Sequence, residues 1–104
     1  MARFDVRSNL NRASREQVPY LVELQADLLS GLATRFVAPL VPASRFGTPA
    51  ARLNPVFRIG ARNFVMDTAL CAAIPSKQLG ERITSLSPRA PDVLAAIDLL
   101  ISGI

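Results

Sequence analysis

The sequence predicts a mainly β protein, a small antiparallel barrel or strongly bent sheet with one α-helix at its C-terminus. Two observations predict this fold. Short apolar runs rich in β-branched and aromatic residues recur through residues 3–75, separated by glycine, proline and polar turns. Residues 92–102 instead repeat apolar residues with a period of about 3.6, which is typical of an amphipathic helix. We therefore expect five or six short antiparallel strands followed by one helix.

The first two strands are predicted from alternation. Residues 3–6 (RFDV) alternate apolar with charged side chains, and residues 8–17 are polar and turn-rich, which predicts a loop. Residues 20–29 alternate a mostly polar face with an apolar face, which is the period of a strand. The alternation slips at Leu28 and Leu29, so at least one of these leucines is expected to face water.

The middle of the chain predicts a third strand and a hairpin. Residues 34–41 are β-branched and aromatic, and Pro39 lacks an N–H, which favours an edge strand or a bulge there. Residues 42–51 are expected to form a loop or a loosely turned segment. Residues 55–68 form the clearest local pattern, because two apolar runs flank the four-residue loop 60–63 (GARN), with glycine for the special backbone angle.

The last part of the chain ends in the predicted helix. Residues 69–75 are a short apolar run closed by proline and predict a buried strand, whereas 76–91 is polar and punctuated. For the helix 92–102, Gly103 is a typical left-handed stop, after which Ile104 is expected to pack back on the last turn. The stripe expected to face the core comprises Val93, Ala96, Ile97, Leu100 and Ile101.

The composition fits one globular domain over residues 1–104, with 50% hydrophobic and 19% charged residues. No apolar segment is long enough to span a membrane, and the N-terminus lacks the apolar part of a secretory signal, so we expect a cytoplasmic location. Cys71 is the only cysteine and there is no histidine, which argues against a disulfide, a zinc site or a histidine-based triad. We expect no cofactor and no metal.

The positive charge is concentrated in the first part of the chain. Residues 1–62 contain nine arginines against four acids, whereas residues 63–104 contain three bases against four acids. Eleven of the twelve basic residues are arginine, which suits pairing with carboxylate or phosphate groups. An acidic partner, nucleic acid and dispersed solvated charge all fit this composition.

No constellation of residues points to an enzyme. Cys71 lies in an apolar run and is expected to be a small core residue rather than a nucleophile. Asp92 and Asp98 are six residues apart and do not share a helix face, which excludes an acid–base pair on the helix. Asp98 and Ser102 do share a face, beside an apolar helix end. Such a face is typical of a docking surface and also of any amphipathic helix.

Several strings, in the same order, resemble the CcdB toxins of plasmid and chromosomal toxin–antitoxin systems. The family opens with a Phe-x-Val strand and ends with a helix that closes flush at Gly-Ile, and the likeness covers nearly the whole chain. The matching strings are Phe4-Asp5-Val6, LQADLL (24–29), VAPL (37–40), NPVFRIG (54–60), LGERI (79–83) and AIDLLISGI (96–104).

The resemblance implies an SH3-like β-barrel of the CcdB/MazF type that forms a homodimer in the bacterial cytoplasm. It implies a poison of DNA gyrase rather than an enzyme: the toxin binds the gyrase A subunit and traps its complex on cleaved DNA. It also implies a cognate CcdA-like antitoxin with an acidic C-terminal segment, which the arginine-rich first part of this chain suits. No direct nucleic-acid or membrane binding is expected.

The resemblance also assigns gyrase-binding residues, position by position, and two of them depart from the family pattern. Ser102 stands where the family has tryptophan, and Asp98 stands where it has asparagine. A ribonuclease toxin of the same fold, and a toxin-like homologue with altered or lost gyrase binding, therefore stay open as alternatives. The assigned residues are Leu28, Leu29, Asp98, Ile101, Ser102, Gly103 and Ile104.

Overall fold

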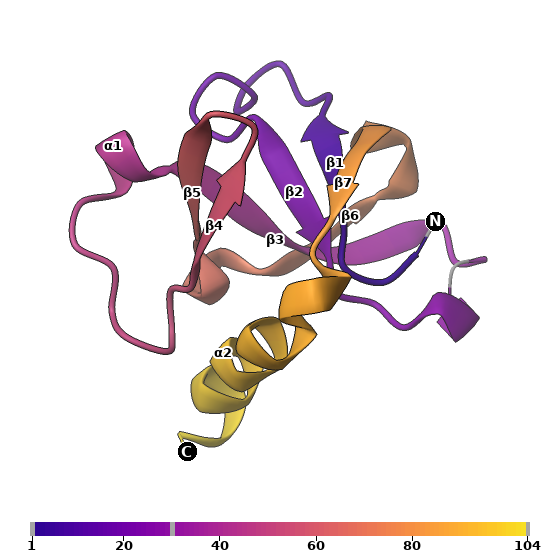
Figure 1. Cartoon of the computed structure of the whole chain (residues 1–104). Coiled ribbons are helices and arrows are strands. Elements are labelled where there is room, and N and C mark those ends of the chain that lie inside the picture. Colours follow the sequence, from indigo (N-terminus) through magenta and orange to yellow (C-terminus); the bar gives the residue numbers. More distant parts are fainter. Residues whose placement is uncertain (1, 30, 104) are drawn as a thin grey trace.

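The predicted fold class is confirmed by the computed structural model, which describes residues 2–29 and 31–103 (Figure 1). Seven antiparallel strands form one curled half-barrel sheet, and a helix follows at the C-terminal end. The strands are β1 (Asp5–Asn9), β2 (Tyr20–Glu23), β3 (Thr34–Pro42), β4 (Val56–Ile59), β5 (Arg62–Met66), β6 (Ala72–Pro75) and β7 (Leu79–Ser85). The helices are α1 (Ala43–Phe46) and α2 (Ala90–Ser102), with 3-10 turns η1 (Asp27–Leu29), η2 (Thr68–Leu70), η3 (Ser76–Gln78) and η4 (Ser87–Arg89).

The strand order in the sheet is β4-β5-β3-β2-β1-β7, and β6 also pairs with β3. The expected edge position or bulge at Pro39 is wrong, because β3 lies inside the sheet and pairs with β2 along one side in an unbroken register through Pro39. On its other side β3 pairs first with β6, over 34–37, and then with β5, over 40–42. Pro39 falls between these two partners, so its missing N–H interrupts neither ladder, and its carbonyl accepts from the Asp67 N–H at 2.9 Å.

Strand β2 is shorter and more deeply buried than predicted. It ends at Glu23 rather than at residue 29, and η1 follows instead of a strand. The predicted polar face is also wrong, because Leu21 and Glu23 are 6% and 3% exposed. The reason is a second apolar cluster on that side of the sheet, to which Leu21 belongs, together with arginines that face Glu23.

Three further strand predictions need correction. The first strand runs to Asn9, beyond the predicted 3–6, and β7 arises within 76–91, where no strand was expected, because the two pair with each other. The 69–75 run contains β6, but this strand is mostly exposed rather than buried. Within the described part of the chain, β6 pairs with β3 alone, and of its four residues Ile74 is the one partly buried, against the second apolar cluster.

The predicted hairpin is confirmed as β4 and β5. Its loop is shorter than the predicted 60–63, because Ile59 pairs with Arg62 and only two residues form the turn. Gly60, the first of them, has a φ of 61°. Two-residue turns of type II′ need glycine at this position. The predicted 42–51 loop includes the four-residue helix α1.

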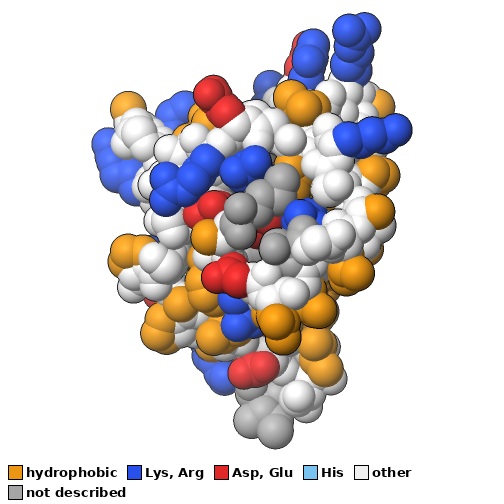
Figure 2. All heavy atoms as spheres, turned by 90° about the vertical axis from the view of Figure 1, so that its right-hand side faces the viewer, with side chains coloured by type: hydrophobic (Ala, Val, Ile, Leu, Met, Phe, Trp, Pro, Cys, Tyr) orange, Lys and Arg blue, Asp and Glu red, His pale blue; other side chains and the backbone are white. Residues whose placement is uncertain are grey.

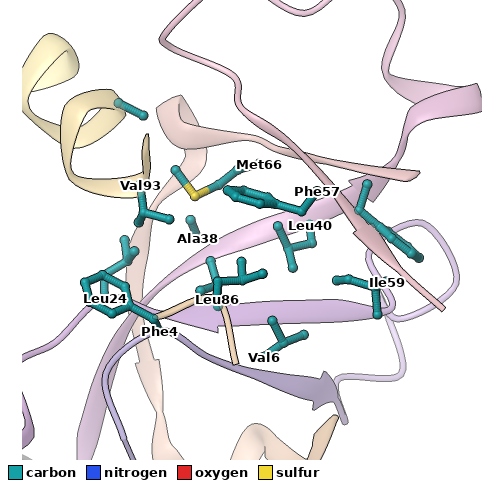
Figure 3. Close-up of a cluster of buried hydrophobic side chains, with 13 residues drawn as sticks. Phe4, Val6, Leu24, Ala38, Leu40, Phe57, Ile59, Met66, Leu86 and Val93 are labelled. Carbon is teal, nitrogen blue, oxygen red and sulfur yellow. The ribbon is translucent and has the colours of Figure 1, made fainter. Parts of the chain in front are cut away.

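The main core fills the hollow of the half-barrel, with side chains from the sheet and from α2 pointing into it (Figure 3). The aromatic side chains of Phe57 and Phe64 are fully buried there, and Cys71 is partly buried against this core, which agrees with its expected packing role. The buried members are Phe4, Val6, Val22, Leu24, Ala38, Leu40, Phe57, Ile59, Phe64, Met66, Leu86, Val93 and Ala96.

Helix α2 closes one end of this hollow. The predicted stripe is confirmed in its first half, because Val93 and Ala96 are fully buried and Ile97 packs against the core. It is wrong in its second half, because Leu100 and Ile101 are 40% and 74% exposed. The sheet does not extend beneath the last turn of α2, which projects away from it in Figure 1.

We expect Val93→Ala to lower the free energy of unfolding by about 2 kcal/mol, because it removes two buried methyl groups and leaves a cavity under the helix. Urea unfolding measures this change. The matched control is Leu94→Ala on the outer side of the same helix, where the side chain is 37% exposed and the cost should stay below about 1 kcal/mol. Equal losses for both variants would mean that α2 is not docked through Val93.

Candidate partner-docking surface

The last turn of α2 is an exposed apolar helix end. Pro91 and Asp92 in the first turn suit the start of a helix, and Asp92 pairs with Arg89 at 2.6 Å. The helix stops at Gly103, as predicted, with a left-handed φ of 72° and an N–H that donates to the Leu99 carbonyl at 2.9 Å. Contacts therefore stabilise α2 at both ends. Ile101 lies in its last turn, and its side chain is 74% exposed.

The same helix end carries negative charge. The carbonyl groups of a last helical turn concentrate partial negative charge, which nearby bases usually offset. This last turn has no basic residue, and Asp98 is exposed beside it with Ser102 one turn further along the same face. This helix end could therefore bind a partner that offers an apolar side chain to Ile101 and a cationic group to Asp98.

A second exposed apolar group lies on η1. Leu28 is 93% exposed and Leu29 is 46% exposed, which confirms the prediction that at least one of them faces water. Side-chain hydrogen bonds fix the backbone of this short turn. They run from Arg3 Nε to the Leu24 carbonyl (3.0 Å), from the Arg3 N–H to Asp27 Oδ1 (2.5 Å) and from Gln25 Nε2 to the Leu29 carbonyl (2.8 Å).

The structure does not bring the predicted site residues together in one patch of a single chain. Asp98, Ile101, Ser102 and Gly103 all lie exposed at the end of α2. Figure 1 shows η1 on a different side of the molecule from that end. Ile104, with its predicted packing contact, lies outside the described residues. On the face drawn in Figure 2, basic side chains gather toward the top, and hydrophobic side chains are exposed toward the bottom, where α2 ends.

A cluster of charged side chains that the sequence did not predict lies on the strands next to η1, and three of its members, Asp5, Glu23 and Arg35, are buried. Glu23 on β2 lies 4.0 Å from Arg7 on β1 and 3.6 Å from Arg35 on β3. Asp5 on β1 pairs with Arg82 on β7 at 3.0 Å. The Arg35 guanidinium also donates to the carbonyls of Leu32, in the loop before β3, and of Thr34, the first residue of β3. The sequence does place acidic and basic residues in the segments that form these strands. It does not show which of them face each other, because that depends on how the strands pair.

Burial raises the pKa of Glu23 above its ordinary value of 4.5. The Arg7 guanidinium partly opposes this rise in the pKa, the Asp5 carboxylate adds to it, and Arg35 opposes it. Within the described residues, Arg7 Nε and Glu23 Oε2 are buried without a hydrogen-bond partner. The separation of 4.0 Å explains why attraction to Arg7 does not outweigh the loss of hydration.

Glu23→Gln should therefore change how stability depends on pH. The folded protein retains a proton that the unfolded chain releases above pH 4.5, so the contribution of Glu23 to stability is largest below that pH and falls as pH rises toward the raised pKa. We expect the free energy of unfolding of the wild type, minus that of Glu23→Gln, to decrease between about pH 4 and pH 7 in urea titrations.

Two features sharpen this measurement. Burial also raises the pKa of Asp67, but Asp67 is present in both proteins and cancels in the difference. Glu16→Gln removes the same charge at an exposed site of the same chain and serves as the control. A Glu23→Gln difference that stays constant over this range of pH would contradict the buried position of the Glu23 carboxyl.

Comparison with known protein families matches nearly the whole chain. The model of the family described as CcdB protein matches residues 3–103, nearly the whole chain. The matched residues include β1 to β7, α2 and both exposed apolar groups. Within the described ranges, no helix is long and apolar enough to cross a membrane.

Proposed function

The chain belongs to the CcdB family of toxins from toxin–antitoxin systems, and from this premise we propose that it binds the A subunit of DNA gyrase and traps the enzyme on cleaved DNA. The observation that carries the proposal is the projecting last turn of α2, where Ile101, one of the residues that the resemblance assigns to this contact, is 74% exposed. We infer that binding buries Ile101 and places a basic group of gyrase near Asp98.

The proposal extends to the assembly. We propose a homodimer, in which a two-fold axis supplies two copies of the α2 end and two copies of η1 to the target. The separation of Leu28 and Leu29 from the α2 end within one chain supports this view, because a single small contact cannot cover both groups. We propose neutralisation by an antitoxin with an acidic segment, which the nine arginines of residues 1–62 suit.

Expression in a sensitive bacterial host tests the function. We expect growth arrest together with gyrase-linked DNA cleavage. Arrest with degraded RNA and intact DNA would instead support a ribonuclease toxin of the same fold. Suppression of the arrest by co-expressed antitoxin would support neutralisation, and a gyrase-resistant host that still arrests would contradict the gyrase target.

One observation favours a second candidate function. Ser102 offers a small hydroxyl at an exposed position where the family places its aromatic anchor, and anchors of that type commonly contribute about 2 kcal/mol or more to binding. A homologue that binds an antitoxin and leaves gyrase active would follow from this loss. The expression experiment separates the two, because this second candidate predicts normal growth.

A further inference from the structure

The turn η1 projects from the sheet without an apolar anchor (Figure 1). None of its residues, Asp27–Leu29, is buried, and among the described residues neither apolar cluster includes them. A segment with so few apolar contacts opens at a low free energy unless polar contacts hold it. Because Leu28 and Leu29 lie on this turn, its hydrogen bonds decide how the two leucines are presented to a partner.

The side-chain amide of Gln25 joins η1 to strand β3. Strand β2 ends at Glu23, and one more backbone bond follows, from the Leu24 N–H to the Phe36 carbonyl at 2.9 Å. The chain then turns away into η1. At this point Gln25 Oε1 accepts from the Phe36 N–H at 3.2 Å, and Gln25 Nε2 donates to the Leu29 carbonyl at 2.8 Å. We call this pair of hydrogen bonds the Gln25 tether.

The Gln25 tether takes the place of a backbone bond between the strands. In a continued antiparallel pair, the Phe36 N–H would donate to the Leu24 carbonyl. That carbonyl instead accepts from Arg3 Nε at 3.0 Å, and the Arg3 N–H donates to Asp27 Oδ1 at 2.5 Å. Arg3 thereby attaches the start of η1 to the N-terminal segment, while Gln25 attaches its end to β3.

The Gln25 tether requires the chemistry of glutamine. It needs a donor and an acceptor at the same end of one uncharged side chain, which the amide of asparagine or glutamine supplies. Asparagine is one methylene shorter. Glutamate would keep the acceptor but would place a second oxygen against the Leu29 carbonyl.

One further hydrogen bond reaches the same carbonyl. The Leu32 N–H donates to the Leu29 carbonyl at 3.2 Å, and the Leu32 carbonyl accepts from Nη1 of the buried Arg35. This longer bond remains when Gln25 is replaced. Loss of the Gln25 tether should therefore loosen η1 and leave the sheet folded.

We propose that Gln25 is a positioning residue for partner binding, which holds η1 against β3 so that Leu28 and Leu29 meet the partner in one conformation. This inference rests on the proposed function, with the gyrase A subunit as the partner. A loose turn must be ordered when it binds, and that ordering costs affinity, whereas the Gln25 tether orders the turn beforehand. Gln25 acts through the two leucines.

The test variant is Gln25→Met, which keeps a similar length and zero charge and removes both hydrogen bonds of the Gln25 tether. Titration calorimetry should show that binding to the purified gyrase A subunit weakens about tenfold or more. Gln17→Met makes the same change at an exposed glutamine of the 8–17 loop and should bind within about twofold of the wild type. Urea unfolding should show both variants folded, because neither glutamine belongs to an apolar cluster.

A double-mutant cycle separates positioning from a general loss of structure. Leu28→Ala removes one of the groups that Gln25 is proposed to position. In that background the loss caused by Gln25→Met should fall to about threefold or less, because residues that act together are not additive. The same tenfold loss with and without Leu28 would overturn the proposal.

Amide hydrogen exchange tests the Gln25 tether without gyrase. The Leu29 N–H donates to the Ala26 carbonyl at 2.9 Å, and the Leu32 N–H donates to the Leu29 carbonyl. Both amides should exchange about tenfold faster or more in Gln25→Met, while the Val22 amide in β2 keeps its rate.

The two measurements distinguish failure of this inference from failure of the proposed function. Binding by the wild type with unchanged affinity of Gln25→Met would overturn the inference alone, whether or not exchange becomes faster. Unchanged exchange rates would overturn it as well, because η1 would then be held without Gln25. No binding by the wild type would overturn the proposed function, and with it the role of Gln25 in binding gyrase.

Discussion

Ile101→Asp is expected to weaken binding to the gyrase A subunit by about a hundredfold or more, equivalent to about 2.7 kcal/mol. The side chain is the most exposed apolar group of α2, and the substitution places a charge where the proposed contact excludes water. Titration calorimetry with the purified A subunit measures the change, and growth arrest in the host should be lost in parallel.

The control for this substitution is Leu10→Asp, which introduces the same charge at a leucine that is 49% exposed and outside the proposed contact. Leu10→Asp should keep the free energy of unfolding within about 0.5 kcal/mol of the wild type, since Leu10 does not belong to the core. Ile101→Asp should lower it by no more than about 1 kcal/mol, because it adds a negative charge to the last turn of α2 but removes no core side chain. Binding by Ile101→Asp within threefold of the wild type would remove Ile101 from the contact.

Ser102→Trp is expected to tighten binding to the gyrase A subunit at least tenfold. An indole at this position adds a large apolar surface beside Ile101, and aromatic anchors dominate many protein interfaces. Because Ser102 is exposed in the last turn of α2, the larger side chain meets no packed neighbour in the described structure. A two-fold dimer would gain the contact twice. The same calorimetric titration gives the result.

Ser44→Trp, on the exposed surface of α1, controls for a general increase in apolar surface. Equal tightening by both tryptophan variants would mean that the gain is unspecific. Unchanged binding by Ser102→Trp, with the wild type still bound, would place the contact elsewhere on the molecule. Tightening confined to Ser102→Trp would show that the α2 end retains the geometry of a docking surface.

Local patterns in the sequence were enough to predict the fold class and most of its elements. Alternation located β2, β-branched and aromatic residues located β3, the glycine turn located the hairpin, and the 3.6-residue period with Gly103 located α2. Such patterns reflect which side chains share a face, and they do not depend on the neighbouring strand. They could not show that the polar face of β2 is covered, because Glu23 is buried only through arginines on β1 and β3.

The same distinction applies to the candidate site. The slip in alternation at Leu28 and Leu29 predicted that at least one of them faces water, and both do, although they lie on η1 rather than at the end of a strand. The period of α2 placed Leu100 and Ile101 on the core stripe, yet they are exposed because the sheet ends before the last helical turn. The Gln25 tether was also beyond prediction, since it depends on which residue of β3 lies beside the end of β2.

Direct binding of the wild-type chain to the purified gyrase A subunit, with cleaved DNA as a second readout, tests the central proposal most directly. We predict a complex with a dissociation constant in the micromolar range or below, about 8 kcal/mol of binding free energy, and accumulation of cleaved DNA when the chain is added to active gyrase. No complex at about 100 µM of each protein, together with gyrase reactions that yield no additional cleaved DNA, would contradict it.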